Sequence, residues 1–158
     1  MSVEMAESVV AYIGLGANLG DPRGAVLSAM QAIADLDDVV VTRKSSLYGS
    51  APVDAGGGDY VNAVVEVQTR LQPHDLLAKL HGIEQSAGRA RPYRNAPRTL
   101  DLDVLLYDQL TLDDSQLTIP HPRMWQRAFV LRPLAEIAPA LVTKDQLQAV
   151  ADQPIWAL

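Results

Sequence analysis

The order in which strand-like and helix-like segments follow one another is the feature that most constrains the fold. Extended apolar or alternating patterns occur over residues 9–14, 39–48, 60–69 and 100–107. Apolar residues at helical spacing begin near Pro22 and again at Pro73. The resulting order, β-α-β-β-α-β, predicts a ferredoxin-like α+β sandwich, a largely antiparallel sheet with helices packed on its face.

Local signals set the expected ends of these segments. Glycines in GLGANLG are expected to end the first strand at Gly14, and the glycines at 56–58 predict a loop before the third strand. Residues 111–124 are expected to be irregular, with a short strand among them. A third helix is predicted over Arg127–Ile137 despite its proline, and a small helix near 145–151.

Length and composition predict one domain, residues 1–158, with an aliphatic core. The chain has 158 residues, of which 48% are hydrophobic, but only one Phe and no Cys. Its first residues, MSVEMAES, lack the basic and apolar regions of a secretory signal. No apolar run approaches the ~20 residues that span a bilayer. We therefore expect a cytoplasmic protein without membrane contact, and a monomer, because no heptad or symmetric apolar stripe favours assembly.

Charge is distributed unevenly along the chain. The net charge of −6 argues against a nucleic-acid-binding protein, which normally carries a basic patch. Nevertheless four of the 13 basic residues, Arg89, Arg91, Arg94 and Arg98, fall within ten positions. The cluster indicates either a phosphate-binding segment or a solvated basic loop, and composition favours neither.

The most informative segment is RTLDLDVLLY at residues 98–107. If it forms a strand, Asp101 and Asp103 share one face. Leu102 and Val104 then face the core. The Cα atoms of the two aspartates would lie roughly 6.6 Å apart, and their carboxylates repel each other unless a cation lies between them. Hard oxygen ligands without nearby His or Cys favour magnesium, and such a pair could bridge two ions.

An isolated pair of aspartates of this kind is more often the solvent face of a strand. Here the arginine-rich segment runs directly into the strand and brings cations beside the carboxylates. A polyphosphate with bound magnesium requires that combination, so the metal-binding interpretation is favoured.

Three segments of the chain resemble a known family. They are YIGLGANLGD, PRTLDLDVLLY and TIPHPRMWQRAFVLRPLAEIAP, and together they extend over nearly the whole chain. Their combination is highly specific for the 6-hydroxymethyl-7,8-dihydropterin pyrophosphokinases of folate biosynthesis. The resemblance implies a ferredoxin-like fold, in agreement with the element order. It also implies transfer of pyrophosphate from ATP to the pterin hydroxymethyl group, with release of AMP and with two magnesium ions as cofactor.

The resemblance also implies roles for individual residues. Asp101 and Asp103 would bind both magnesium ions. The catalytic set adds the arginines Arg89, Arg91 and Arg98. Positions matched to ATP contacts are Glu84, Arg98, Val104, His121 and Arg127. Positions matched to the pterin site are Ser50, Ala51, Val53, Tyr60, Asn62 and Phe129.

Some of these residues also have ordinary structural explanations. Phe129, the only Phe, would by itself indicate core packing. His121, between two prolines, would by itself indicate a turn histidine with its hydrogen bonds satisfied. A flat heterocycle with an amide-like edge nevertheless needs apolar faces and a donor–acceptor group. Phe129 and Tyr60 supply the faces in the resemblance, and Asn62 supplies the donor and acceptor.

Two positions depart from the family pattern. The family loop carries Trp where this chain has Asn95, so we expect Tyr93 or Arg94 to close the site instead. Pro122 stands where an aromatic residue is common, which removes one nucleotide contact. Loop 89–97 is expected to close once both substrates have bound, excluding water.

Other functions fit the sequence less well. GLGANLG has the spacing G-x-G-x-x-x-G, one residue longer than the dinucleotide-binding motif, and no acidic residue ends the second strand. No P-loop motif is present. A catalytically silent pterin- or nucleotide-binding module on the same fold is the remaining alternative. No residue stands out as a general base, so positioning and electrostatics are expected to supply most of the catalysis.

Overall fold

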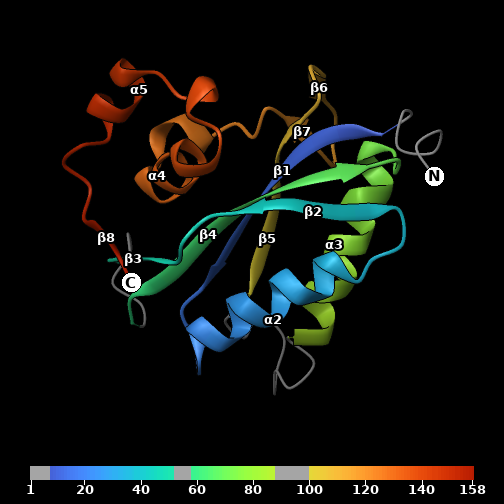
Figure 1. Cartoon of the computed structure of the whole chain (residues 1–158), viewed down its shortest axis with the longest axis horizontal. Coiled ribbons are helices and arrows are strands. Elements are labelled where there is room, and N and C mark those ends of the chain that lie inside the picture. Colours follow the sequence, from blue (N-terminus) through green and yellow to red (C-terminus); the bar gives the residue numbers. More distant parts are fainter. Residues whose placement is uncertain (1–7, 52–57, 88–99) are drawn as a thin grey trace.

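The computed structural model describes residues 8–51, 58–87 and 100–158. Its centre is a six-stranded sheet in the order β5-β1-β4-β3-β8, with β2 also pairing with β4 (Figure 1). Neighbouring strands in this sheet are antiparallel. The strands are β1 (Val9–Ala17), β2 (Val39–Lys44), β3 (Tyr48–Ser50), β4 (Tyr60–Thr69), β5 (Asp101–Tyr107) and β8 (Ile155–Ala157). A separate two-stranded hairpin consists of β6 (Leu112–Asp113) and β7 (Thr118–Ile119).

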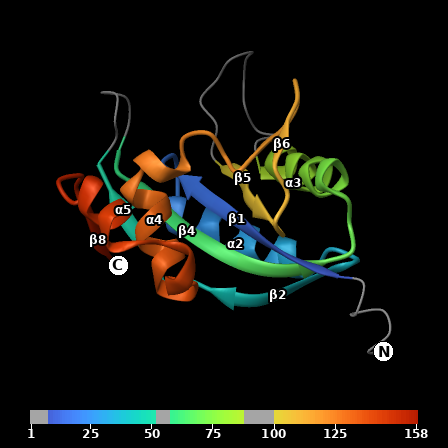
Figure 2. The ribbon, with the colours of Figure 1, turned by 90° about the horizontal axis from the view of Figure 1, so that it is seen from above.

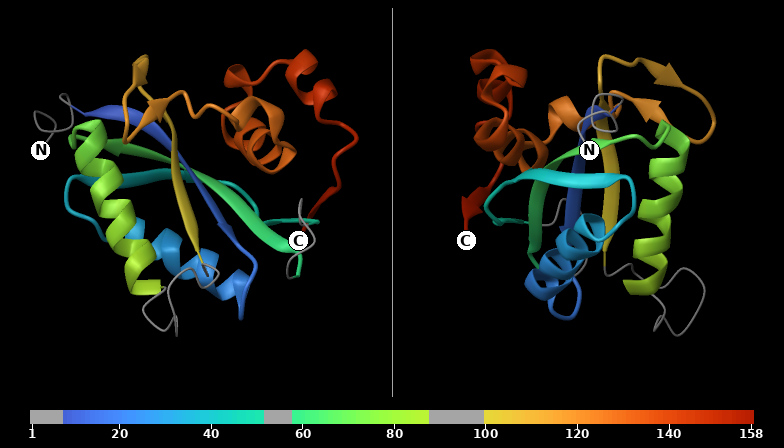
Figure 3. Two further views of the ribbon diagram at one scale, coloured as in Figure 1. Left: turned by 180° about the vertical axis from the view of Figure 1, so that it is seen from behind. Right: turned by 45° about the vertical axis from the view of Figure 1, so that its right-hand side comes forward.

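Two crossover units explain the strand order and confirm the ferredoxin-like α+β fold class. The chain passes from β1 to β2 through α2 (Pro22–Ala34), and β4 lies between these two strands in the sheet. It passes from β4 to β5 through α3 (Pro73–Ala87), with β1 between them. Both helices cover the same face of the sheet, as Figure 3 shows.

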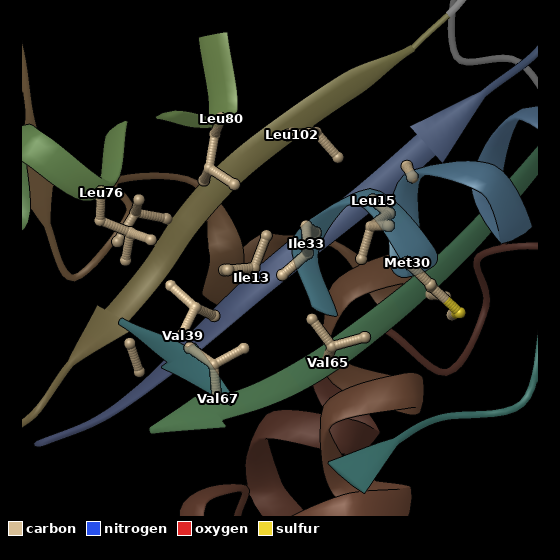
Figure 4. Close-up of a cluster of buried hydrophobic side chains, with 14 of the residues drawn as sticks. Ile13, Leu15, Met30, Ile33, Val39, Val65, Val67, Leu76, Leu80 and Leu102 are labelled. Atoms are coloured by element: carbon tan, nitrogen blue, oxygen red, sulfur yellow. The ribbon is translucent and has the colours of Figure 1, made fainter. Parts of the chain in front are cut away.

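The main hydrophobic core lies between these two helices and the sheet. Asp21 caps α2 by accepting a hydrogen bond from the Gly24 N–H at 3.1 Å, and Pro22 fits the first turn because its fixed φ suits a helix start. The apolar face predicted for this helix is buried. Figure 4 shows its contacts with the strands and α3, through Ile13, Leu15, Met30, Ile33, Val65, Val67, Leu76, Leu80 and Leu102.

The first strand does not end at Gly14, as was predicted, but continues to Ala17. Glycine can pair within a sheet, and Gly14 and Gly16 both have partners in β4 and β5. Leu15 and Ala17 are buried in the main core. On the other face of the strand, the missing side chains of the two glycines leave the end of the sheet uncovered.

The second predicted strand, residues 39–48, is divided into β2 and β3. Ser45 lies between the two strands. Its N–H donates to the Val64 carbonyl oxygen at 2.9 Å, and its hydroxyl accepts from the Val64 N–H at 3.0 Å. Because a side-chain oxygen replaces a backbone carbonyl at this point, the regular ladder is interrupted. β2 and β3 therefore pair with opposite ends of β4.

The remaining helices lie on the opposite face of the sheet (Figure 2). They are η1 (Met124–Gln126), α4 (Ala128–Ile137), η2 (Pro139–Leu141) and α5 (Lys144–Ala149). α4 confirms the predicted third helix with Pro133 inside it, and α5 is the small helix expected near its position. Leu131 and Leu134 of α4 form a second core with Val64 and Leu105 of the sheet. Among the described helices, none combines the length and apolar character needed to cross a membrane.

Candidate functional site

A cavity of about 900 Å³ opens between the sheet and the start of α4. Three neighbouring strands, β5, β1 and β4, contribute to its floor, and residues between Arg123 and Val130 form much of its wall. The strand register aligns the floor residues in a row. Gly16 of β1 is paired with Asp101 of β5 on one side and with Asn62 of β4 on the other.

The two glycines of β1 keep this cavity open. A Cβ atom at Gly16 would lie 3.3 Å from Asn62 Oδ1, and one at Gly14 would lie 3.4 Å from the Leu105 side chain. Side chains at either position would occupy the space above the sheet. The GLG sequence, which predicted the end of a strand, instead marks a place where a ligand can approach the backbone closely.

Asp101 and Asp103 both line this cavity from β5, as the alternation of side chains along a strand predicted. Leu102 and Val104 lie on the other face of the strand, where each is 2% exposed in the main core. The side chain of Val104, a position expected near ATP, is therefore directed away from the cavity.

Glu84, near the end of α3, holds the strand that carries the two aspartates. Its carboxylate accepts a hydrogen bond from the Leu102 N–H at 2.7 Å. A backbone N–H bound to a carboxylate makes a short, charge-assisted bond. The contact therefore ties α3 to β5 between Asp101 and Asp103.

His121 lies beside Asp103 in a restrained turn. Its backbone N–H donates to the Leu105 carbonyl oxygen at 3.0 Å, and its Nδ1 accepts from the Arg123 N–H at 3.2 Å. The neutral ring therefore carries its proton on Nε2, which lies 4.0 Å from Asp103 Oδ1. Burial lowers the pKa of His121, Asp103 raises it, and Arg127 and Arg123 lower it, with a downward result. At neutral pH the ring is an uncharged donor beside the carboxylate.

Asn62 lies on the cavity floor with its orientation held by Ser50. Its Nδ2 donates to Ser50 Oγ at 2.8 Å, and both residues are buried. Ser50 uses one of the amide hydrogens, so the Asn62 side chain retains a second donor and its carbonyl acceptor. Ala51, directly after β3, and Tyr60, at the start of β4, line the same cavity.

Arg127 and Phe129 line the cavity from the start of α4. Phe129 packs at the edge of the second core but is only partly buried. The guanidinium carbon of Arg127 lies 5.3 Å from the centroid of its ring, a cation–π contact that orients the arginine. The partial exposure of the ring toward the cavity favours the stacking interpretation over core packing alone.

Several predicted site residues lie outside the described residues. These are the three arginines expected to bind phosphate, Arg89, Arg91 and Arg98, and one position of the pterin site, Val53. The departures from the family pattern at positions 93–95 lie outside them as well.

The structure adds cavity residues that the sequence analysis missed. Arg123 lines the cavity, and a basic residue directly after PHP was a signal that could have revealed it. Gln126, Gln153 and Pro154 line it too. No sequence signal marks Gln153 and Pro154, because only the return of the C-terminal segment brings them to the site.

The carboxylate pair suits a cation that brings other ligands with it. Over residues 8–51, 58–87 and 100–158, no group of three or more His, Cys, Asp or Glu could hold a metal ion. Asp101 and Asp103 supply hard oxygen donors. Mg²⁺ usually takes one or two carboxylates and completes its shell with water and phosphate oxygens. The donor set therefore fits magnesium bound together with a polyphosphate.

Fold and cavity together define a class of protein. It is a ferredoxin-like α+β domain whose cavity combines carboxylates suited to a hydrated cation, arginines suited to an anion and a buried amide suited to a heterocycle. The family model described as 7,8-dihydro-6-hydroxymethylpterin-pyrophosphokinase (HPPK) matches residues 12–139. The chain belongs to this family.

Individual relatives agree with the family model. A Bacillus subtilis protein named 2-amino-4-hydroxy-6-hydroxymethyldihydropteridine pyrophosphokinase is 41% identical over 145 residues, covering 91% of this chain and 86% of that protein. The Pseudomonas aeruginosa protein of the same name is 44% identical over 135 residues, covering 85% and 83%. These relatives are similar in length to this chain.

Solved structures support the fold. An HPPK-DHPS crystal structure in complex with substrates aligns with a TM-score of 0.66 at 13% sequence identity, covering 84% of this chain. A Plasmodium falciparum HPPK-DHPS triple mutant aligns with a TM-score of 0.64 at 14% identity, also over 84% of this chain. The chain spans 40% of the length of each of these proteins. At such low identity the likeness concerns the fold alone.

Proposed function

We propose that residues 1–158 act as one domain that transfers pyrophosphate from ATP to the hydroxymethyl group of 6-hydroxymethyl-7,8-dihydropterin, releasing AMP. By its family and its named relatives, the chain is an ATP-dependent pyrophosphokinase of folate biosynthesis. The observation that carries the assignment of the site is that Asp101, Asp103, Asn62 and Phe129 line one cavity. Neither the family nor the relatives support a catalytically silent module.

Asp101 and Asp103 are the proposed ligands of two magnesium ions that arrive with ATP. When bound, the ions would neutralise charge on the triphosphate and lower the pKa of the pterin hydroxyl. His121 would donate from Nε2 to a phosphate oxygen, a role supported by the 4.0 Å between this nitrogen and Asp103 Oδ1. Glu84 would support these ligands indirectly, because its carboxylate accepts a hydrogen bond from the Leu102 N–H of β5.

The pterin would lie above the glycines of β1, where the cavity has room for a flat ring. Asn62 presents a donor and an acceptor to the edge of the ring, in an orientation that Ser50 maintains. Phe129 and Tyr60 line the cavity and are the proposed stacking partners for the two ring faces. Tight discrimination follows, because a substrate lacking the amide-like edge would leave the second amide hydrogen and the carbonyl oxygen of buried Asn62 without the hydrogen bonds that the pterin would make.

The phosphates of ATP would be bound by the arginines of the cavity wall. Arg127, matched to an ATP contact, and Arg123 both line the cavity. A guanidinium can bind two phosphate oxygens at once, which orients the chain of phosphates. Arg89, Arg91 and Arg98 lie outside the described residues, and their part in phosphate binding stays a prediction.

The proposed reaction is attack of the pterin hydroxyl oxygen on the β-phosphorus of ATP. A new oxygen–phosphorus bond forms, the bond between the β-phosphorus and the oxygen bridging it to AMP breaks, and the hydroxyl proton leaves to solvent. His121 carries its proton on the nitrogen facing Asp103 and so is a donor, not a base. The residues therefore act mainly by aligning the two substrates and by balancing negative charge on the leaving AMP.

The test is formation of AMP from ATP, magnesium and 6-hydroxymethyl-7,8-dihydropterin. The wild-type chain should form AMP only when the pterin is present. Asp101→Asn and Asp103→Asn should each lower the rate by about 100-fold or more, as expected for loss of a group that stabilises transition-state charge. Asp113→Asn, on the exposed β6 hairpin, is the matched control and should retain the wild-type rate. Wild-type rates in both site variants would refute the assignment.

Other expectations from the sequence extend this proposal. A cytoplasmic location, a monomeric state and the absence of nucleic-acid binding stay predictions.

A further inference from the structure

The C-terminal segment contributes to the cavity although the family match ends before it. The family model matches residues 12–139, while α5 and β8 lie within residues 144–157. β8 pairs with β3 at the edge of the sheet, and the return of the chain places Gln153 and Pro154 in the cavity lining.

Gln153 makes two hydrogen bonds that bracket a single residue of the site. Its Oε1 accepts from the Ala128 N–H at 2.8 Å, and its Nε2 donates to the Gln126 carbonyl oxygen at 2.9 Å. The residue between these two positions is Arg127. The amide of Gln153 thus binds the backbone on both sides of Arg127 from 25 positions away.

The first N–H groups of a helix need a partner outside the helix. Arg127 occupies the position before α4, and its side chain makes no capping hydrogen bond. Ala128 is the first residue of the helix, and the Gln153 side chain supplies the acceptor for its N–H. The Arg127 side chain makes no capping hydrogen bond; it contacts the Phe129 ring and lines the cavity.

We propose that Gln153 is a positioning residue, which fixes the backbone at Arg127 so that Arg127 and Phe129 are oriented for the two substrates. The inference rests on the proposed function of the cavity. It makes the segment beyond the family match a part of the functional site.

Loss of the Gln153 amide should disturb the site more than the fold. α4 keeps its backbone bonds from Val130 and Leu131 to the Arg127 carbonyl oxygen, at 3.1 Å and 3.0 Å. Its buried face remains packed in the second core. The backbone of Gln153 is held within the C-terminal segment by its N–H, which donates to the Val150 carbonyl oxygen at 3.1 Å. The backbone on either side of Arg127 would lose two restraints, and the side chains that it carries would lose their preorganisation.

The test compares Gln153→Ala with Gln148→Ala, a control in the same tail whose side chain is exposed on α5. Steady-state kinetics of AMP formation should show a KM for ATP and for the pterin about tenfold higher in Gln153→Ala, the size expected for loss of about one net hydrogen bond, with kcat within about twofold. Gln148→Ala should match the wild type. A purely structural role predicts the opposite pattern, because unfolded molecules lower the apparent kcat and leave KM unchanged.

Two further variants sharpen the result. Gln153→Glu keeps an acceptor for the Ala128 N–H but places a carboxylate beside the Gln126 carbonyl oxygen, so it should restore only part of the wild-type KM. In an Arg127→Ala background, Gln153→Ala should raise the KM for ATP less than it does in the wild type, since the two changes act through the same contact. Full additivity, or an unchanged KM in Gln153→Ala, would overturn the proposal. Absence of AMP formation by the wild type would refute the proposed function. An active wild type with an unchanged KM in Gln153→Ala would refute only the role of Gln153.

Discussion

The N–H of Leu102 donates to the carboxylate of Glu84 at 2.7 Å, and Leu102 lies between the two aspartates of β5. One residue of α3 therefore controls the edge of the strand on which both proposed magnesium ligands are carried. The side chain of Leu102 is buried in the main core, where the residue is 2% exposed, and anchors the same position of the strand. Helix and core together therefore hold the backbone of β5 between the two aspartates.

Replacing Glu84 should weaken use of ATP and magnesium more than it weakens the fold. Glu84→Ala leaves the Leu102 N–H without its acceptor, and we expect kcat/KM for ATP to fall about tenfold, the effect of losing one charge-assisted bond. Glu84→Gln keeps an acceptor and should show a smaller loss. Kinetics at varied magnesium concentration measure both effects. Gln85→Ala, exposed on the same helix, is the control, and an unchanged magnesium dependence in Glu84→Ala would contradict the prediction.

Adding one methyl group to the cavity floor should obstruct the pterin. In Gly16→Ala the new Cβ lies 3.3 Å from Asn62 Oδ1, so either the amide moves or the ring is displaced. We expect the KM for the pterin to rise about tenfold, consistent with an overpacking cost of about 1–3 kcal/mol. Kinetics at saturating ATP isolate the effect.

A second glycine provides the matched control for this change. A Cβ built at Gly82, which is exposed in α3, meets no atom within 4 Å beyond its chain neighbours and the backbone of its own helix. Gly82→Ala should raise stability by about 0.4–1 kcal/mol in thermal unfolding, because alanine has less chain entropy to lose, and should leave both KM values unchanged. Equal effects of the two substitutions on the pterin KM would contradict the role given to Gly16.

The stability of the β3 edge should depend on pH through Glu136. Burial acts to raise the pKa of Glu136, but hydrogen bonds from the Tyr48 hydroxyl and from Ser46 outweigh it, so the pKa lies below its ordinary value of 4.5. As the pH falls, the unfolded chain takes up this proton before the folded chain does. The stabilisation is therefore present above about pH 4.5 and is lost as the pH falls through the folded pKa.

Thermal unfolding between pH 3 and pH 7 tests this linkage. Wild type should be more stable than Glu136→Gln at neutral pH. The difference should shrink as the pH falls below about 4.5, where the unfolded chain takes up the proton, and should vanish once the pH is below the folded pKa. Because Tyr48 is the register partner of Asn62, the variant should also raise the KM for the pterin modestly. A difference in melting temperature that stays constant across the range would rule out the ionised carboxylate as its cause.

Much of the fold was predictable because its signals are local. The helical spacing of Val26, Ala29 and Ile33 placed α2, and alternation along RTLDLDVLLY placed Asp101 and Asp103 on the face opposite the core. The same reasoning failed at Gly14, because a glycine that ends a strand and one that continues it look alike in sequence. It failed at Ser45, because an interruption by a side-chain hydroxyl depends on Val64, which lies 19 positions away.

The sequence by itself determined the β-α-β-β-α-β order, the paired carboxylates and the family to which the chain belongs, since each depends on neighbouring residues or on a continuous motif. Only the tertiary structure decided that α4 covers the opposite face, that Gly14 and Gly16 open a cavity and that Gln153 holds the backbone around Arg127. These features are contacts between segments far apart in the chain. Their energy comes from packing and hydrogen bonds that exist only once the sheet has formed, and no local pattern encodes them.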